Sequence, residues 1–244
     1  MNEPAVRPGE PDMAAVAAMF ADPRRVRILV ALSDGRALPA TRLAAEAGVA
    51  ASTASTHLSA LLNAGLVSVE SSGRHRFYRL ASPHVEGVLE ALSTLAPTQP
   101  ITSLRAYTRA GRLRAGRTCY RHLAGRLGVE LFGSMIAAGW VTGGDGSYDP
   151  MFDSLSAAGK GTSYRLTDYG AEALQHWDID RALLDTATPL KYCVDWTEQA
   201  HHLAGPLGAS VCELFRRRGW VENGTVARSV MLTDRGRKAL SDIE

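Results

Sequence analysis

Residues 40–80 constrain the fold of this chain more than any other stretch, because two short helical patterns there precede two short extended ones. Gly48 separates the helical patterns, and the second of them ends just before Gly65. The four segments are the helical 41–47 and 52–63 and the extended 67–71 and 75–80. Two helices across a glycine-containing turn predict a helix-turn-helix, and the hairpin that follows predicts a wing.

Polar side chains gather where the second helix begins and at the tip of the hairpin. Small donors and acceptors that face outward at a helix N-terminus suit phosphate oxygens and base edges. Arginine and histidine at a wing tip suit phosphate or the minor groove. The residues that we predict to contact DNA are Arg42, Ser52, Thr53, Ser55, Thr56, His57, Arg74, His75 and Arg76. A helical pair alone also occurs in proteins that do not bind DNA, so the prediction depends on the pair together with the wing.

Residues 19–92 also resemble the ArsR/SmtB-type winged-helix repressors. The resemblance rests on a first core helix at 22–29, a recognition helix and its exit at 55–67, and a wing at 74–80. It implies a homodimer that represses transcription at a palindromic operator and releases it when an inducer binds. Two features depart from the family: the recognition helix has no Arg or Lys, and segment 42–48 lacks the cysteine pair with which many relatives sense metals.

Length and composition limit the class of protein further. A chain of 244 residues is long enough for two domains, and contents of 45% hydrophobic and 21% charged residues are typical of a soluble globular protein. No apolar run approaches the roughly 20 residues of a membrane helix, and the first residues carry no secretion signal pattern. Three cysteines are too few for a disulfide framework. We therefore expect a cytoplasmic protein.

Composition shifts along the chain predict four parts. They are a flexible N-terminal arm at 1–11, a winged helix-turn-helix DNA-binding and dimerisation domain at 12–95, a proline-containing linker at 96–100, and a C-terminal effector-sensing domain at 101–244. The last part opens with an arginine-rich run, 103–121, that contains no acid. This run could follow a DNA backbone, pair with acidic groups of the N-terminal half, bind an anionic ligand or form a solvated face.

The C-terminal part contains an internal repeat. The segment 122–128 recurs at 202–208 with the shared sequence His-Leu-Ala-Gly-x-Leu-Gly. Gly-Trp-Val and Leu-Thr-Asp-x-Gly motifs follow in both copies, which span about 117–180 and 190–244. Each copy reads as helix, hairpin and threonine-capped helix. The expected fold is therefore mainly α with small β-hairpins (α+β), a winged helix-turn-helix followed by two winged-helix-like modules.

Several residues at or ahead of the two His-Leu-Ala-Gly motifs could bind an effector. They are Tyr107, Cys119, Tyr120, His122, Cys193, Asp195, Trp196, Glu198 and His202. These residues could be core and hydrogen-bonded structure, the aromatic walls of an organic-ligand pocket, or ligands of a transition metal. Neither cluster has a tight Cys-x-x-Cys or His-x-x-x-His pattern, so no metal site and no certain cofactor is assigned.

The sequence favours a regulator over an enzyme, because it has no nucleophile elbow, phosphate loop or cofactor fingerprint. We predict a homodimeric transcriptional repressor of a palindromic operator, released by a small molecule or metal bound in the C-terminal domain. One alternative is a metal- or thiol-redox-responsive regulator that uses Cys, His and Asp of the repeats. Another is a DNA-binding protein whose C-terminal half is only a dimer or partner module. The expected partners are double-stranded DNA, a second copy and an effector, with no membrane.

Overall fold

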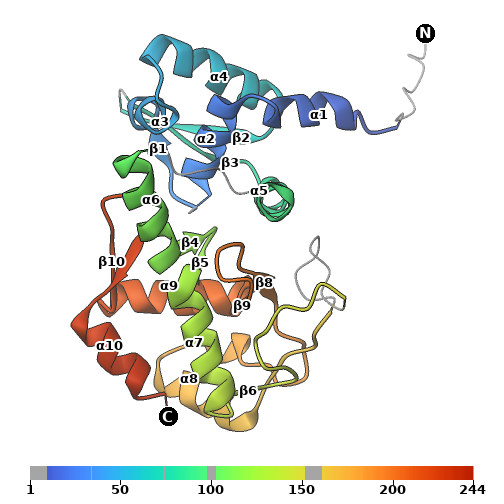
Figure 1. Cartoon of the computed structure of the whole chain (residues 1–244), viewed down its shortest axis with the longest axis vertical. Coiled ribbons are helices and arrows are strands. Elements are labelled where there is room, and N and C mark those ends of the chain that lie inside the picture. The colour runs from blue at the N-terminus through green and yellow to red at the C-terminus, as the bar shows by residue number, and fades with distance from the viewer. Residues whose placement is uncertain (1–9, 34, 74, 98–102, 152–160, 244) are drawn as a thin grey trace. The chain divides into compact units, whose positions relative to one another are not determined.

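The computed structural model of the chain describes residues 10–33, 35–73, 75–97, 103–151 and 161–243. The chain divides into two compact units (Figure 1). Met1–Leu32 and Arg36–Ser82 form the N-terminal unit, and Ser33–Gly35 and Pro83–Glu244 form the C-terminal unit. Each unit has its own architecture and is described separately.

The described residues of the N-terminal unit form four helices and one small sheet. The helices are α1 (Met13–Phe20), α2 (Pro23–Leu32), α3 (Ala40–Ala47) and α4 (Ala51–Asn63), and the strands are β1 (Leu38–Pro39), β2 (Val67–Ser72) and β3 (His75–Leu80). All strand pairs are antiparallel, in the order β1-β3-β2. The predicted helix-turn-helix and wing are confirmed, with helix and strand ends within one residue of the expected ones. The short strand β1 was not expected.

The core of this unit lies between α2, α3 and α4, whose apolar stripes meet. The buried residues of these helices are Ile28, Leu29, Ala31, Leu32, Leu43, Ala44, Ala47, Ala54, Leu58 and Leu61. Val26 on α2 and Leu62 on α4 are only half-buried. Gly48 ends α3 with φ of 70°, a left-handed conformation that turns the chain sharply into α4. This turn sets the angle at which α4 presents its N-terminus.

The C-terminal unit begins with α5 (Pro83–Leu95) and α6 (Leu104–Ala115). Two copies of the same order of elements follow. The first copy holds β4 (Arg117–Cys119), β5 (His122–Ala124), α7 (Gly125–Ala137), β6 (Val141–Thr142), β7 (Arg165–Leu166) and α8 (Asp168–His176). The second holds β8 (Tyr192–Val194), β9 (His201–Leu203), α9 (Gly205–Arg217), β10 (Val221–Asn223), β11 (Val230–Leu232) and α10 (Asp234–Ser241). A single 3-10 turn, Arg181–Leu183, lies between them.

Each copy therefore starts with a hairpin that sequence reasoning did not foresee, so the Cys and His clusters lie on strands. The predicted threonine caps are confirmed: the backbone N–H of Gly170 donates to Thr167 and that of Gly236 donates to Thr233, at 3.0 and 3.1 Å. The copies pack reciprocally, with α7 against β9 and α9 against β5. One hydrophobic core extends through both copies. The two copies thus form one packed body within this unit.

Some expectations concern residues that the structure describes only in part. Of the predicted arm, only residues 10 and 11 are described, and of the predicted linker only 96 and 97. By its contacts, α5 groups with the C-terminal unit, whereas the sequence grouped it with the DNA-binding domain. None of the helices in the described part of the chain has the length and hydropathy needed to cross a bilayer.

Candidate functional site

The N-terminus of α4 is the first candidate contact surface. Its N-cap residue is Ala50, whose methyl side chain cannot accept a hydrogen bond from the first turn. Ser52 and Thr53 are exposed in that turn. In the next turn, the hydroxyl groups of Ser55 and Thr56 donate to the carbonyls four residues earlier, at 3.0 and 3.3 Å. Their oxygen lone pairs remain exposed, so this end of α4 offers both amide donors and hydroxyl acceptors to a ligand.

Two other predicted DNA contacts are more constrained. The expectation that His57 faces outward is wrong for part of its ring: the residue is half-buried and its Nε2 atom is buried. The backbone N–H groups of Arg24 and Arg25 outweigh desolvation and lower the pKa of the Asp22 carboxyl group, and the nearby His57 ring adds to this effect. Arg42 on α3 is exposed but forms an ion pair with Glu46 at 3.2 Å.

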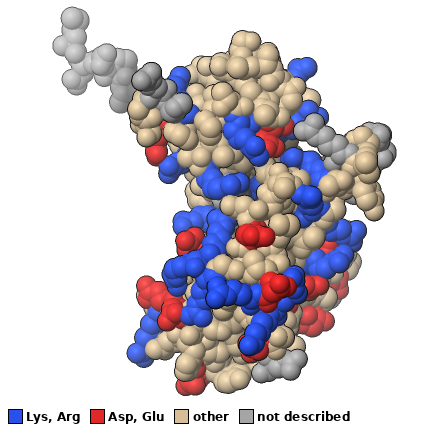
Figure 2. All heavy atoms as spheres, turned by 90° about the vertical axis from the view of Figure 1, so that its left-hand side faces the viewer, with Lys and Arg blue, Asp and Glu red and all other residues tan. Residues whose placement is uncertain are grey.

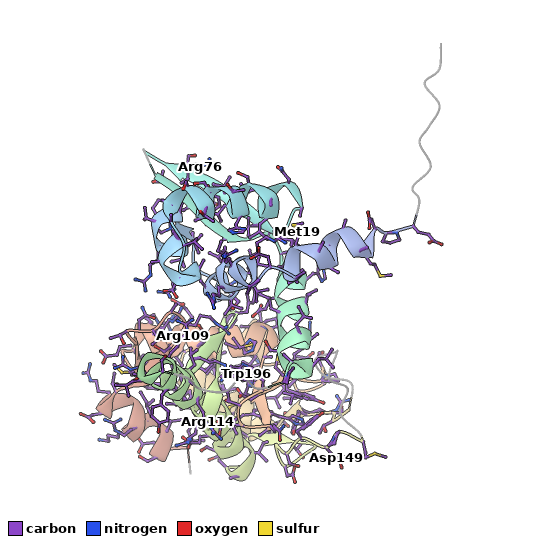
Figure 3. All side chains as sticks on the ribbon, turned by 45° about the horizontal axis from the view of Figure 1, so that its top comes forward. Met19, Arg76, Arg109, Arg114, Asp149 and Trp196 are labelled. Atoms are coloured by element: carbon purple, nitrogen blue, oxygen red, sulfur yellow. The ribbon has the colours of Figure 1, made fainter. Side chains whose placement is uncertain are left out.

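The wing is a six-pair antiparallel ladder, from Val67 opposite Leu80 to Ser72 opposite His75. Gly73 at its tip has φ of 59°. Arg76 is exposed on β3, and Figure 3 labels it near the outer end of the hairpin. The predictions for Arg74 and for the side chain of His75 fall outside the described parts of the chain. Of the three residues predicted to contact DNA at the wing tip, Arg76 is the one whose side chain the structure describes.

The predicted basic run at 103–121 is not a uniform charged face. Arg114 pairs with Glu198 at 2.9 Å, and Arg112 donates to Thr225. Arg117 is buried, with 1% of its side chain exposed. Figure 2 shows acidic side chains interspersed among the basic ones on the visible face. A solvated or phosphate-binding role is thus wrong for Arg117.

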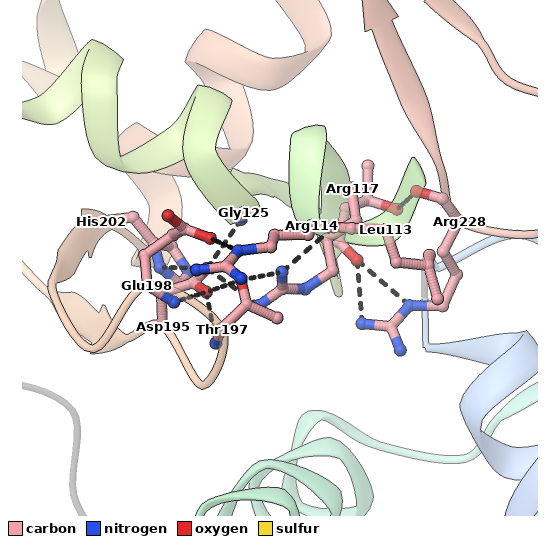
Figure 4. A network of polar contacts seen from close by, with 10 residues as sticks. Leu113, Arg114, Arg117, Gly125, Asp195, Thr197, Glu198, His202 and Arg228 are labelled. Carbon is pink, nitrogen blue, oxygen red and sulfur yellow. Dashed lines mark hydrogen bonds and ion pairs between the residues drawn. The ribbon is translucent and has the colours of Figure 1, made fainter. Parts of the chain in front are cut away.

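Asp195 is the centre of a buried polar network in the C-terminal unit (Figure 4). Its Oδ2 accepts from Arg117 Nη2 at 2.8 Å and from the backbone N–H of Gly125 at 2.6 Å. Its Oδ1 accepts from the backbone and hydroxyl of Thr197, at 2.9 and 2.7 Å, and from the backbone of Glu198 at 3.2 Å. Both oxygens are occupied inside the protein, so Asp195 is not the free effector ligand that the sequence predicted. It joins the second repeat to the start of α7 in the first.

The pKa values of Asp195, His202 and His122 are all lowered in this buried region. Burial acts to raise the pKa of Asp195, but Arg117, His202 and the hydrogen bond from Thr197 outweigh it and hold that pKa well below its ordinary value. Burial lowers the pKa of His202 to about 4 and also lowers that of His122 well below its ordinary value. Both imidazoles are therefore neutral near pH 7.

The two unforeseen hairpins place Cys and His in equivalent positions. In β4–β5, Cys119 lies opposite His122, and in β8–β9, Cys193 lies opposite His202. The rings of His122 and His202 have centroids 5.1 Å apart. One donor atom each of Cys119, His122 and His202 lie within 4.8 Å of one another, and all three residues are buried. The structure thus brings together three predicted site residues from two distant segments.

Two glycines permit the approach of the hairpins. A Cβ atom on Gly208 of α9 would lie 3.2 Å from His122 Cβ, and one on Gly128 of α7 would lie 3.5 Å from His202 Cβ. Each would also lie under 3.0 Å from the carbonyl oxygen at the end of its own repeat's hairpin, Leu203 or Leu123. Each histidine therefore packs over a glycine of the other repeat. This explains why the repeated motif carries glycine at that position.

The other predicted effector residues do not form a buried aromatic pocket. Tyr107 is 65% exposed on α6, and Tyr120 occupies the turn of β4–β5 with φ of 53°. Trp196 is 45% exposed, with the guanidinium carbon of Arg117 4.6 Å from its ring centroid. Glu198 forms an ion pair with Arg114. Sequence reasoning missed the structural role of Arg117, whose only signal was its place in the arginine-rich run 103–121.

Comparison with known proteins identifies the class. The sequence profile of the bacterial regulatory protein arsR family matches residues 22–69. An uncharacterized HTH-type transcriptional regulator, YdfF of Bacillus subtilis (strain 168), is 34% identical over 229 residues, which are 94% of this chain and 95% of YdfF. The HTH-type transcriptional regulator CmtR of Mycobacterium bovis is 43% identical over 83 residues, 34% of this chain and 70% of CmtR.

Among solved structures, the NMR structure of the cadmium metal-sensor CMTR from Mycobacterium tuberculosis is 38% identical, covering 38% of this chain and all of that chain with a TM-score of 0.30. The near full-length match to YdfF, the matching profile and the winged helix-turn-helix decide the class. The chain belongs to the ArsR family of DNA-binding transcriptional regulators.

Proposed function

We propose that this regulator is a homodimeric repressor that reads a palindromic operator with α4 and the wing and releases it when an effector binds the C-terminal unit. The observation that carries the proposal is the exposed N-terminus of α4. It combines an alanine N-cap with the exposed hydroxyl groups of Ser52, Thr53 and Thr56. Uncapped amides suit phosphate, and hydroxyl groups suit either phosphate or base edges.

Exposed apolar side chains on two helices support a dimer. Met13 and Val16 on α1 are 79% and 42% exposed, and Val88 and Leu92 on α5 are 41% and 42% exposed. Each helix turns apolar residues to solvent that a second copy would cover. A twofold dimer would present two α4 helices to two half-sites of a palindrome.

An effector in the C-terminal unit could act through the buried Asp195 network. The network joins the loop that follows β8 to the start of α7, so a ligand bound beside it would act on both repeats together. A change in this unit that alters the two α4 helices of the dimer would lower operator affinity, and DNA would lower effector affinity by the same factor.

The recognition role of α4 is tested with the Thr56→Ala variant and DNA from the protein's own promoter region. A lost base contact should lower operator affinity by roughly 1–3 kcal/mol while affinity for scrambled DNA changes little. Fluorescence anisotropy with both DNA molecules measures the ratio. Ser241→Ala is the control, because Ser241 is an exposed hydroxyl on α10 that also donates to a nearby helix carbonyl.

An equal loss on operator and scrambled DNA would show that Thr56 touches only phosphate, and it would remove α4 as the reader of sequence. No change on either DNA would remove Thr56 from the interface.

A further inference from the structure

Three metal-binding side chains converge in the C-terminal unit although they come from two strand pairs that are distant in sequence. Cys119 lies at the end of β4, His122 at the start of β5 and His202 in the middle of β9. One donor atom of each lies within 4.8 Å of the other two. Zinc-type ions bind sulfur at about 2.3 Å and imidazole nitrogen at about 2.0–2.1 Å, so one ion could hold all three side chains once small rotations bring the donor atoms closer together.

The two histidines lack hydrogen bonds where a metal would bind. The Nε2 atoms of His122 and His202 are buried without a hydrogen-bond partner, and only 6% and 1% of these residues is exposed. Buried polar atoms in native proteins are nearly always satisfied, so each unsatisfied atom calls for an explanation such as a bound ion. Each of these histidines also contributes one donor atom to the cluster with Cys119, so a single ion would account for both.

A carboxylate behind His202 suits this arrangement. Asp195 Oδ2 lies 3.4 Å from His202 Nδ1, although the two atoms are not aligned as a hydrogen bond. Histidines that bind metals usually direct their other ring nitrogen toward a carboxylate or carbonyl, which fixes the tautomer. The position of Asp195 therefore leaves Nε2 of His202 for the ion. The positive charge of Arg117 is offset by its 2.8 Å contact with Asp195, which limits its repulsion of a cation.

We propose that Cys119 Sγ, His122 Nε2 and His202 Nε2 bind one divalent transition metal ion of the zinc type in the C-terminal unit. The thiol of Cys119 gives its proton to solvent and binds as thiolate, while both imidazoles bind in their neutral form. Sulfur and imidazole donors select such an ion over magnesium or calcium, which prefer oxygen. Three protein ligands leave one position open.

The bound ion would join the two repeats. His122 belongs to the hairpin that α9 packs against, and His202 to the hairpin that α7 packs against. One ion held by both histidines fixes the two halves of the unit relative to each other. A regulatory role for the ion rests on the proposed function, in which this unit receives the effector, whereas metal binding itself does not depend on DNA.

The site is tested by titrating the metal-stripped full-length protein with Co²⁺, a spectroscopic substitute for Zn²⁺. We expect one Co²⁺ per chain, a thiolate-to-cobalt charge-transfer band, the visible bands of tetrahedral cobalt, and displacement by Zn²⁺. Cys119→Ser should abolish the charge-transfer band. His122→Gln and His202→Gln should weaken binding by at least the roughly 10–100-fold that outer-shell changes cost.

The matched control is Cys212→Ala. Cys212 is buried on α9, and burial raises the pKa of its thiol to about 11, so its removal should leave the cobalt spectrum unchanged. Circular dichroism checks that each variant is folded. Absence of stoichiometric Co²⁺ binding by the wild-type protein would overturn the proposal, as would an unchanged charge-transfer band in Cys119→Ser.

The spectroscopic readout separates this proposal from the proposed function. Cobalt binding that occurs without any effect on operator affinity would support the site and contradict its regulatory role. Operator release by another compound, in a protein that binds no cobalt, would contradict the site and leave the repressor function standing.

Discussion

Asp195 carries more of the C-terminal unit's stability than its single charge suggests. It is fully buried, pairs with a buried arginine and accepts three backbone N–H groups, from Gly125, Thr197 and Glu198. Such a carboxylate cannot be replaced without leaving donors unsatisfied. Breaking a buried ion pair from one side is strongly destabilising because the remaining charge has no partner.

We therefore expect Asp195→Asn to lower the free energy of unfolding by about 3–5 kcal/mol. The amide removes the negative charge opposite Arg117 and places N–H donors toward the existing donors. Asp178→Asn is the control, because Asp178 also pairs with an arginine, Arg218, but is 71% exposed. That change should cost less than about 1 kcal/mol. Urea denaturation of both variants measures the difference, and equal losses would show that the buried network contributes no more than a surface pair.

At the residue scale, sequence predicted some site members but not their partners. Cys119 and His122 are three positions apart, so their proximity was foreseeable. Cys193 and His202 are neighbours only through strand register, and no short-range pattern reveals that. The Arg117–Asp195 pair joins two repeats. In the sequence, Arg117 is therefore one of many arginines and Asp195 reads as a free carboxylate. Side-chain partners set by tertiary contacts cannot be read from local spacing.

At the element scale, glycine residues allow the hairpins and helices of the repeats to pack closely. A Cβ on Gly128 would lie 2.3 Å from the carbonyl oxygen of Leu123, whereas one on Gly133, on the same helix, would meet nothing within 4 Å. The first glycine is therefore required by close backbone approach. The second lacks that constraint and incurs only the entropic cost of glycine in a helix.

Opposite effects are expected from two glycine-to-alanine changes on α7. Gly128→Ala should destabilise the protein by about 1–3 kcal/mol, because the methyl group forces β5 away from the helix. Gly133→Ala should be neutral or stabilise it by up to about 1 kcal/mol, since alanine favours the helix. Thermal or urea denaturation distinguishes them. A tolerated Gly128→Ala would contradict the close packing of helix and hairpin.

Elements were predictable where the sequence gives repeated signals. The stripe Ala54, Leu58 and Leu61 with a terminal glycine defined α4, and the Leu-Thr-Asp-x-Gly motif defined the starts of α8 and α10. The hairpins β4–β5 and β8–β9 were missed because strands of three residues are too short to show alternation. Their pairing comes from tertiary contacts with the opposite repeat.

At the scale of the whole molecule, a winged helix-turn-helix unit is followed by a C-terminal unit that we propose to be the sensor. The first presents the exposed N-terminus of α4 and the wing, and the second holds three converging metal donors beside a buried ion pair. In a two-state repressor, an effector lowers operator affinity only if it binds the DNA-free state more tightly. Coupling of roughly 1–3 kcal/mol corresponds to a change of about 5–150-fold in affinity.

The most direct test is fluorescence anisotropy of the full-length protein on DNA from its own promoter region, metal-stripped and with one equivalent of Zn²⁺. We predict salt-dependent binding by the metal-free protein, at least about fivefold weaker binding with Zn²⁺, and no effect of Zn²⁺ on the Cys119→Ser variant. Equal operator affinity with and without bound Zn²⁺ would contradict the claim that this site controls DNA release.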